Sequence, residues 1–405
     1  MAMKHPGLQG RPIYLDYNAT TPVDQRVTAA ISQFMAVEFG NPSSNHTFGQ
    51  VANLALQRAR EQIAELIGAS AAEIIFTGSG SEADALAIRG AFLAARADGR
   101  PRSHMITQVT EHPAVLAACR ELADLHGVAV TYLPVDGYGR VDPDQVENAI
   151  TSETFLISIM HANNETGTVQ PIAKIAAIAR AHGVLMHCDA AQSIGKIPVN
   201  VKDLGVDFLT IVGHKVYAPK GISALYIKTG VHLRPIIGGG GQELGLRAGT
   251  ENVSYALGFG LAAELAAESF LDRESERLAA LRDRLLHSLR KEFPDRVHVH
   301  GHPTEHLPNT LNFRIDGVPA LVLLAAIPEI AASTGSACHE GRDEPSSVLI
   351  ALGLDNDDAL SAIRISLGRW STEAEIDHVA TLLVEATQTF NDATSSRHSH
   401  QPRRN

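Results

Sequence analysis

The chain has 405 residues, of which 44% are hydrophobic and 20% are charged. This composition is typical of a folded globular protein, and the length predicts two or three domains. The 34 lysines and arginines against 45 aspartates and glutamates give a formal charge of −11, which disfavours nucleic acid and anionic membranes as partners. Three cysteines are too few for a disulfide framework or a four-cysteine zinc site, so we expect a cytoplasmic protein without a metal.

The first 260 residues alternate short β-branched segments with alanine-rich helical segments. Strands separated by helices require crossover connections, so the pattern predicts an α/β layer with a mostly parallel sheet. No run of about 18 apolar residues predicts a membrane-spanning helix. We expect strands at 74–77, 128–133, 154–160, 183–188, 208–213 and 223–227, and helices at 82–97, 113–125 and 172–182.

The pattern changes after residue 252. Alanines, leucines and regularly spaced charges predict one long helix over 252–290, of the kind that often bridges two domains. A smaller α+β unit is expected to follow, with strands at 297–300 and 310–315 and a closing helix at 372–387. The polar segment 391–405 is expected to be a disordered tail.

A lysine and an aspartate each follow a buried strand. Lys215 comes directly after the strand at 208–213, and Asp189 closes the strand at 183–188. Lysines usually extend their amine into solvent, and any α/β enzyme contains several such Asp–Lys spacings. The alternative is a lysine that forms a Schiff base with pyridoxal phosphate (PLP), together with a carboxylate that keeps the pyridine nitrogen protonated.

Two loops rich in small residues also suggest chemistry. Residues 77–82 link a strand to a helix, which is either an ordinary capped turn or a site where helix N–H groups bind phosphate. Residues 333–342 surround Cys338 with glycine, serine and charged residues. This cysteine is either an incidental surface thiol or a reactive thiolate, whereas Cys119 and Cys188 lie in apolar segments and are expected to be core residues.

Eight short motifs stand out along the chain: Tyr14–Pro22, Gly40–Ser44, Thr110–His112, Asn163–Gly167, Asp189–Gln192, Gly213–Lys215, Arg247–Thr250 and Gly335–Cys338. In sequence and in order they resemble the cysteine desulfurases of the NifS type, which are PLP-dependent enzymes of the fold-type I (class V) aminotransferase superfamily. The resemblance extends from Ile13 to about Ala386.

The resemblance implies a role for each matching residue. Lys215 would form the Schiff base, Asp189 would pair with the pyridine nitrogen, and Cys338 would accept sulfur as a persulfide. His112 would stack on the cofactor ring and assist proton transfer. The remaining residues would hold the phosphate, the ring hydroxyl or the substrate carboxylate: Gly80, Ser81, His214 and Thr250 for the phosphate, Gln192 for the hydroxyl, and Asn164 and Arg364 for the carboxylate.

The resemblance also implies the assembly. A large PLP-binding domain with a seven-stranded sheet would span residues 13–262, and residues 1–12 with 263–390 would form a smaller α+β domain that carries the cysteine loop. The enzyme would be a homodimer in which Thr250 reaches the neighbouring subunit. Its substrate would be L-cysteine, converted to L-alanine, and its partner a sulfur-acceptor protein.

Two departures from the family pattern leave the exact reaction open. Val212 stands where a phosphate-binding serine is common, and Ser81 replaces a threonine, so the phosphate site differs. Val212 and His339 are also similar to residues of selenocysteine lyases, so that activity is a rival to cysteine desulfuration. Three further functions remain as alternatives, although the motifs match them less completely: a PLP-dependent C–S lyase, an aminotransferase and a non-catalytic sulfur-assembly scaffold.

Overall fold

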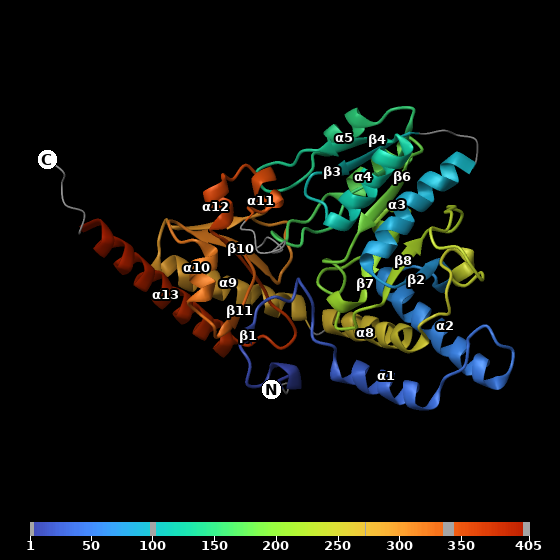
Figure 1. The fold of residues 1–405 in the computed structure, drawn as a ribbon, viewed down its shortest axis with the longest axis horizontal. Helices are drawn as coiled ribbons and strands as arrows, with labels where there is room; N and C mark the ends of the chain where they lie inside the picture. Colours follow the sequence, from blue (N-terminus) through green and yellow to red (C-terminus); the bar gives the residue numbers. More distant parts are fainter. Residues whose placement is uncertain (1–3, 98–102, 272, 335–343, 400–405) are drawn as a thin grey trace.

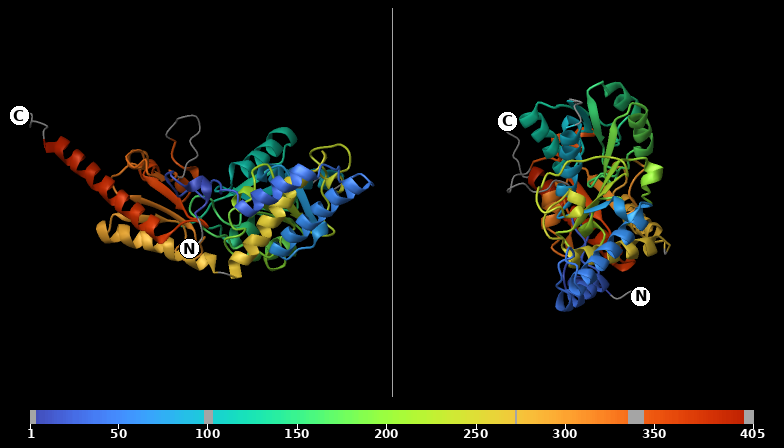
Figure 2. Two further views of the ribbon diagram at one scale, coloured as in Figure 1. Left: turned by 90° about the horizontal axis from the view of Figure 1, so that it is seen from below. Right: turned by 90° about the vertical axis from the view of Figure 1, so that its right-hand side faces the viewer.

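The computed structural model describes residues 4–97, 103–271, 273–334 and 344–399. These residues form two units that lie side by side, each with its own sheet and hydrophobic core (Figure 1, Figure 2). Among the helices of this described part, none has both the length and the apolar character needed to cross a bilayer.

The larger unit is built on a seven-stranded sheet. Strand β8 runs antiparallel to both of its neighbours and the other pairs are parallel, which confirms the predicted α/β fold. Six of the strands were expected from the sequence, and β3 was not. In spatial order the strands are β2 (Ile74–Thr77), β8 (Ser223–Ile227), β7 (Phe208–Val212), β6 (Leu185–Asp189), β5 (Thr154–Ser158), β3 (His104–Gln108) and β4 (Ala129–Leu133).

Helices cover both faces of this sheet. Successive strand residues alternate between two cores, as with Met105 and Ile106, because neighbouring side chains point to opposite faces. One core lies against α3 (Gly80–Ala97) and α4 (Pro113–His126), and the other against α2 (Thr47–Ile67), α6 (Ile172–Ala181) and α8 (Val253–Leu271). Burial on both faces explains why these strands are apolar throughout and why their polar residues stand at the strand ends.

The smaller unit has an antiparallel sheet in the order β12-β10-β9, formed by Ala362–Ser366, Thr310–Ile315 and Val297–His300. Its apolar face packs against α9 (Glu274–Glu292), α10 (Ala320–Ala325) and α13 (Glu373–Ser399) (Figure 1). Strand β1 (Ile13–Tyr14) pairs with β11 (Ile330–Ala331) beside this core. Residues 13–15 therefore pack with the smaller unit, although the sequence analysis grouped them with the larger one.

Two helix predictions differ from the structure. The expected single helix over 252–290 is wrong: α8 and α9 are separate, and Arg273, which precedes α9, has a left-handed backbone with φ 58° that interrupts a right-handed helix. Helix α13 continues to Ser399, into the segment expected to be disordered. No glycine or proline interrupts residues 391–399, so the backbone can stay helical.

Candidate active site

A cavity of about 1060 Å³ lies at the carboxyl edge of the seven-stranded sheet, where the two units meet. Parallel strands end at this edge, so residues that are distant in sequence converge on it. Residues at or after the ends of β2, β3, β5, β6 and β7 all line it, namely Ser81, His112, Asn164, Asp189 and Lys215. The smaller unit contributes Arg364 from β12.

The side chain of Lys215 enters the cavity from a short 3-10 turn after β7. Its Nζ donates hydrogen bonds to the carbonyl oxygens of Asn18 at 2.7 Å and Ala19 at 2.8 Å. Burial, with a smaller contribution from the Arg364 guanidinium, lowers the pKa of Lys215 to about 8. A larger share of its amine is therefore neutral near physiological pH, as a nucleophile or base requires.

Tyr217, two residues after Lys215, holds this turn in a strained backbone conformation with φ 69°. Its N–H donates to Thr21 Oγ1 at 2.8 Å, and its hydroxyl accepts a hydrogen bond from the Arg369 N–H at 2.8 Å. These two contacts lock the loop that presents the lysine, and a left-handed non-glycine residue persists only where surrounding contacts enforce it.

Asp189 is a buried carboxylate at the end of β6, and its Oδ1 accepts a hydrogen bond from the Ala191 N–H at 2.8 Å. Burial raises its pKa, while His112 and Lys215 act in the opposite direction. Two further buried carboxyls, Asp84 and Glu111, lie near Asp189. Burial raises the pKa of both, and the nearby charge of Asp189 raises it further. A cation placed against Asp189 in the cavity would stabilise the ionised form of its carboxyl.

One end of the cavity, which is expected to bind the cofactor phosphate and is called the phosphate end, lies where α3 begins. Gly80, Ser81 and His214 line the cavity there. A Cβ atom at Gly80 would lie 2.6 Å from Val212 Cγ2, so the valine side chain occupies the space that any larger residue at position 80 would need. Val212 also lines the cavity and offers a methyl group where a serine would offer a hydroxyl.

Thr250 is exposed and does not line the cavity of its own chain. The loop that carries it is nevertheless tied to the phosphate end, because Arg247 Nε donates to Glu82 Oε1 at 2.7 Å. Glu82 in turn accepts a hydrogen bond from the Gly78 N–H at 2.9 Å. The Arg247–Glu82 ion pair was not expected from the sequence.

His112 and Gln192 lie between the phosphate end and the substrate end. His112 caps α4, and its Nδ1 accepts a hydrogen bond from the Ala114 N–H at 3.2 Å. Burial lowers its pKa, so a neutral ring carries its proton on Nε2. Gln192 Nε2 donates to the Asn18 carbonyl at 3.0 Å, and its Oε1 accepts from Lys196 Nζ at 2.9 Å.

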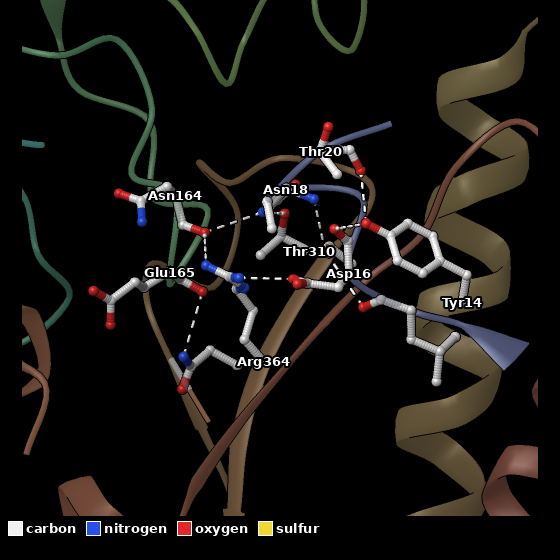
Figure 3. A network of polar contacts seen from close by, with 12 residues as sticks. Tyr14, Asp16, Asn18, Thr20, Asn164, Glu165, Thr310 and Arg364 are labelled. Carbon is white, nitrogen blue, oxygen red and sulfur yellow. Dashed lines mark hydrogen bonds and ion pairs between the residues drawn. The ribbon is translucent and has the colours of Figure 1, made fainter. Parts of the chain in front are cut away.

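The opposite end of the cavity contains an arginine in a polar network (Figure 3). Arg364 Nη2 lies 2.7 Å from Asp16 Oδ1, and its Nη1 donates to the Asn164 carbonyl at 3.2 Å. Its buried Nε donates to no described residue. Asn18 Nδ2 joins the network through the Asn164 carbonyl at 3.2 Å and the Thr310 hydroxyl at 2.9 Å.

Four residues of the cavity region were missed by the sequence analysis: Asp16, Asn18, Glu165 and Lys196. Glu165 lines the cavity, bonds to the Ser346 hydroxyl, and has its pKa raised to about 7 by burial. Lys196 is buried and donates to Asn18 Oδ1 at 3.1 Å. Asp16 and Asn18 belong to a quoted motif and Glu165 to another, but nothing in the sequence alone indicates what they contact.

Of the three cysteines, Cys119 and Cys188 are buried, as expected. Burial raises the pKa of Cys119 to about 12 and that of Cys188 well above its usual range, so both remain thiols. Cys338 and the rest of the segment 335–343 lie outside the described residues. The described part of the chain also contains no group of three or more histidine, cysteine, aspartate or glutamate side chains placed to hold a metal.

The described residues fit PLP. The cavity exceeds the usual 300–1000 Å³ of small-molecule sites and leaves room for an amino acid beside the cofactor. A lysine of lowered pKa suits an aldehyde, and a buried carboxylate suits a pyridinium N–H.

The fold is that of a class of PLP-dependent enzymes, as comparisons with known proteins show. The model of the class-V aminotransferase family matches residues 13–379. A cysteine desulfurase of Trichormus azollae is 47% identical over 382 residues, which cover 93% of each chain. The chain therefore belongs to the class-V aminotransferase family.

Solved structures agree with this assignment. A NifS-like protein superposes with a TM-score of 0.86 at 36% identity, over 93% of this chain and all of the other. The protein SspA in complex with cysteine superposes with a TM-score of 0.77 at 36% identity, over 89% of this chain and all of the other. The predicted fold-type I architecture is confirmed.

Proposed function

We propose that this protein is a PLP-dependent cysteine desulfurase, which converts L-cysteine to L-alanine and transfers the sulfur to Cys338. The observation that carries the proposal is that Lys215, Asp189 and Arg364 line one cavity, from the turn after β7, the end of β6 and the middle of β12. A lysine and a buried carboxylate suit the cofactor, and an arginine suits an α-carboxylate. The curated cysteine desulfurase that is 47% identical supports the reaction.

When bound, PLP supplies an electron sink that stabilises negative charge at the substrate Cα. The residues of the chain then have separate tasks. Lys215 Nζ removes the Cα proton, and a pKa of about 8 lets it accept and return that proton. Asp189 would keep the pyridine nitrogen protonated, and His112 would lie against the ring. Gly80, Ser81 and His214 would hold the phosphate, and Gln192 would donate to the ring hydroxyl oxygen.

The substrate carboxylate binds to Arg364 beside Asn164. Arg364 can offer two parallel N–H groups to it, which fixes the orientation of the amino acid. The Cys338 thiolate attacks the substrate sulfur, the Cβ–S bond breaks, and its electron pair remains with the carbon product. That product takes up protons and leaves as alanine, while Cys338 keeps the sulfur as a persulfide for delivery to an acceptor protein.

The proposal includes a homodimer with Thr250 in the partner's active site. Two observations support it. Thr250 is exposed and does not line the cavity of its own chain. Apolar side chains of α1 (Gln25–Val37), α2 and the segment between them are more than half exposed, as at an unfilled interface: Met35, Val37, Phe39, Phe48 and Leu54. The low cysteine content supports a cytoplasmic location.

The test compares the three cysteines in the PLP-loaded enzyme. Cys338→Ser should keep the cofactor absorbance and L-cysteine binding but form no persulfide and little alanine. Cys119→Ser and Cys188→Ser, which change buried thiols, are the matched controls and should turn over nearly normally. Release of alanine by Cys338→Ser at the parent rate would refute the proposal and favour a C–S lyase.

Selenocysteine lyase is the second candidate, and it rests on Val212, whose methyl groups line the expected phosphate end. Rates of alanine release from L-cysteine and L-selenocysteine, measured with the same preparation, separate the two. Comparable or faster turnover of L-cysteine supports the desulfurase. Turnover confined to selenocysteine would replace it with the lyase.

A further inference from the structure

The carboxylate of Asp16 is paired with Arg364, the arginine that is proposed to bind the substrate carboxylate. Asp16 lines the cavity, and its Oδ1 lies 2.7 Å from Arg364 Nη2. The Arg364 side chain is 8% exposed and that of Asp16 is 24% exposed, so the carboxylate faces the cavity more openly than its partner does. Figure 3 shows the Arg364 guanidinium between the Asn164 carbonyl and the Asp16 carboxylate.

The position of Asp16 does not depend on this ion pair. Its backbone forms a bridge with Ser366, and its carbonyl accepts hydrogen bonds from the Tyr14 hydroxyl at 3.0 Å and from the Ala19 N–H at 3.0 Å. The Tyr14 hydroxyl also donates to the Thr20 carbonyl at 2.9 Å, which closes the loop. The backbone therefore places the Asp16 carboxylate in the cavity whatever its side chain contacts.

Arg364 is likewise held without Asp16. The backbone N–H of Arg364 donates to the Ser333 carbonyl at 2.7 Å, and its side-chain Nη1 keeps the contact with the Asn164 carbonyl. The Asn164 carbonyl is in turn fixed by Asn18 Nδ2. Removing the Asp16 charge should therefore leave the guanidinium in place and change the charge around it.

A ligand carboxylate must approach Arg364 next to this fixed negative charge. The guanidinium has N–H groups to spare, because Nε donates to no described residue. Two carboxylates that share one guanidinium repel each other, and this repulsion is strong where water is partly excluded. Glu165 is the other carboxyl near Arg364, and at its pKa of about 7 it is partly protonated at neutral pH.

An ammonium group on the ligand changes this balance. A zwitterionic amino acid brings its cation next to its carboxylate, so Asp16 repels one end and attracts the other. A simple carboxylate brings only the repulsion. We propose that Asp16 is a specificity-determining residue, whose carboxylate beside Arg364 admits zwitterionic α-amino acids and disfavours carboxylates that lack an ammonium group. This inference rests on the proposed function for the identity of the ligand.

The experiment measures equilibrium binding of N,N-dimethylglycine and 3-methylbutyrate to the PLP-loaded enzyme by ligand-observed NMR. The two ligands have the same shape and differ in the ammonium group, and neither can form a Schiff base with the cofactor. We expect the parent to bind N,N-dimethylglycine at least about tenfold more tightly than 3-methylbutyrate. Asp16→Asn should reduce this ratio about fivefold or more, because 3-methylbutyrate binds more tightly to the variant. Asp16→Glu retains the charge and should retain most of the discrimination.

Asp358→Asn is the matched control. It removes the same charge from an arginine–aspartate pair of the smaller unit, where Arg314 Nη2 lies 2.9 Å from Asp358 Oδ2 and neither residue lines the cavity. This variant should keep the parent ratio. Equal binding of the two ligands by the parent, or 3-methylbutyrate binding that is unchanged or weaker in Asp16→Asn, would overturn the proposal.

The binding assay does not depend on desulfuration. An enzyme that discriminates as expected but releases no alanine from L-cysteine would refute the proposed reaction and support the selectivity of Asp16. An enzyme that desulfurates L-cysteine while Asp16→Asn leaves the binding ratio unchanged would do the reverse. The two failures are therefore distinguishable.

Discussion

The cavity has two halves that are built in different ways. In the larger unit, Asp189 ends a strand and Lys215 lies in the short turn after another, and both strands are buried on both faces, so a rigid sheet determines the positions of the two residues. In the smaller unit, Arg364 lies within a strand, and its contacts come from residues 16, 164 and 333. One half is set by local chain geometry and the other by contacts between segments far apart in the sequence.

This difference matches the tasks proposed for the two halves. A cofactor that stays bound needs fixed partners, and strand ends supply them. A substrate that enters and leaves must exchange contacts, and an arginine whose partners are a carbonyl and a cavity-facing carboxylate can exchange one of them. Substitutions in the first half should therefore affect chemistry, and substitutions in the second half should affect binding.

The largest effect is expected at Lys215. Lys215→Ala removes the proposed base and Schiff-base amine, so alanine release from L-cysteine should fall about 1000-fold or more, since a positioned base contributes roughly 10² to 10⁴. The visible absorbance of the cofactor should change as well. Lys174→Ala, an exposed lysine on α6, is the control and should behave as the parent does. Normal turnover in Lys215→Ala would remove the lysine from the mechanism.

A smaller effect, on binding, is expected in the other half. Arg364→Lys replaces a two-pronged donor by a single ammonium, so the KM for L-cysteine should rise roughly 10- to 100-fold, in line with the loss of a charged hydrogen bond. The cofactor spectrum should be unchanged. Arg314→Lys, on the same sheet but outside the cavity, serves as the control. An unchanged KM with a reduced kcat would show that the two halves are not divided in this way.

The sequence predicted the first half of the site better than the second. Lys215 and Asp189 stand out because each is a charged residue directly after an apolar strand, and this local pattern survives folding. Asp16 and Lys196 give no such signal, because Asp16 pairs with Arg364, 348 positions away, and Lys196 binds the Asn18 side chain, 178 positions away. The break between α8 and α9 was also missed, since a single left-handed residue, Arg273, interrupts an otherwise continuous helical pattern.

The titration of Lys215 tests the cofactor half more finely. Because burial lowers its pKa to about 8, the neutral amine that reacts with an aldehyde becomes the major form above pH 8. The rate at which cofactor-free protein takes up PLP should rise about tenfold between pH 7 and its plateau, with the midpoint near pH 8. Stopped-flow absorbance would follow the uptake. A rate that still climbs steeply at pH 10 would indicate an amine with an ordinary pKa.

The last effect is expected on stability, not on activity, at Glu165, which joins the two halves. It follows β5 in the larger unit and bonds to Ser346, the residue that caps α11 (Ser347–Ala351) in the smaller one. Burial raises its pKa from 4.5 to about 7. Between these two values the unfolded chain is ionised while the folded chain still holds the proton, so this group makes the protein less stable as pH rises.

Glu165→Gln should remove this loss of folding stability at rising pH, because glutamine does not ionise. Relative to the parent, its free energy of unfolding should increase by about 3 kcal/mol between pH 4.5 and pH 8, at 1.36 kcal/mol per unit of pKa difference. Thermal melts at several pH values would show this as a gain of a few degrees that appears only toward the higher pH. The exposed Glu305→Gln should show no such trend. A stability difference for Glu165→Gln that does not vary with pH would mean that the Glu165 carboxyl is already ionised at pH 5, and that the junction holds a charge rather than a proton.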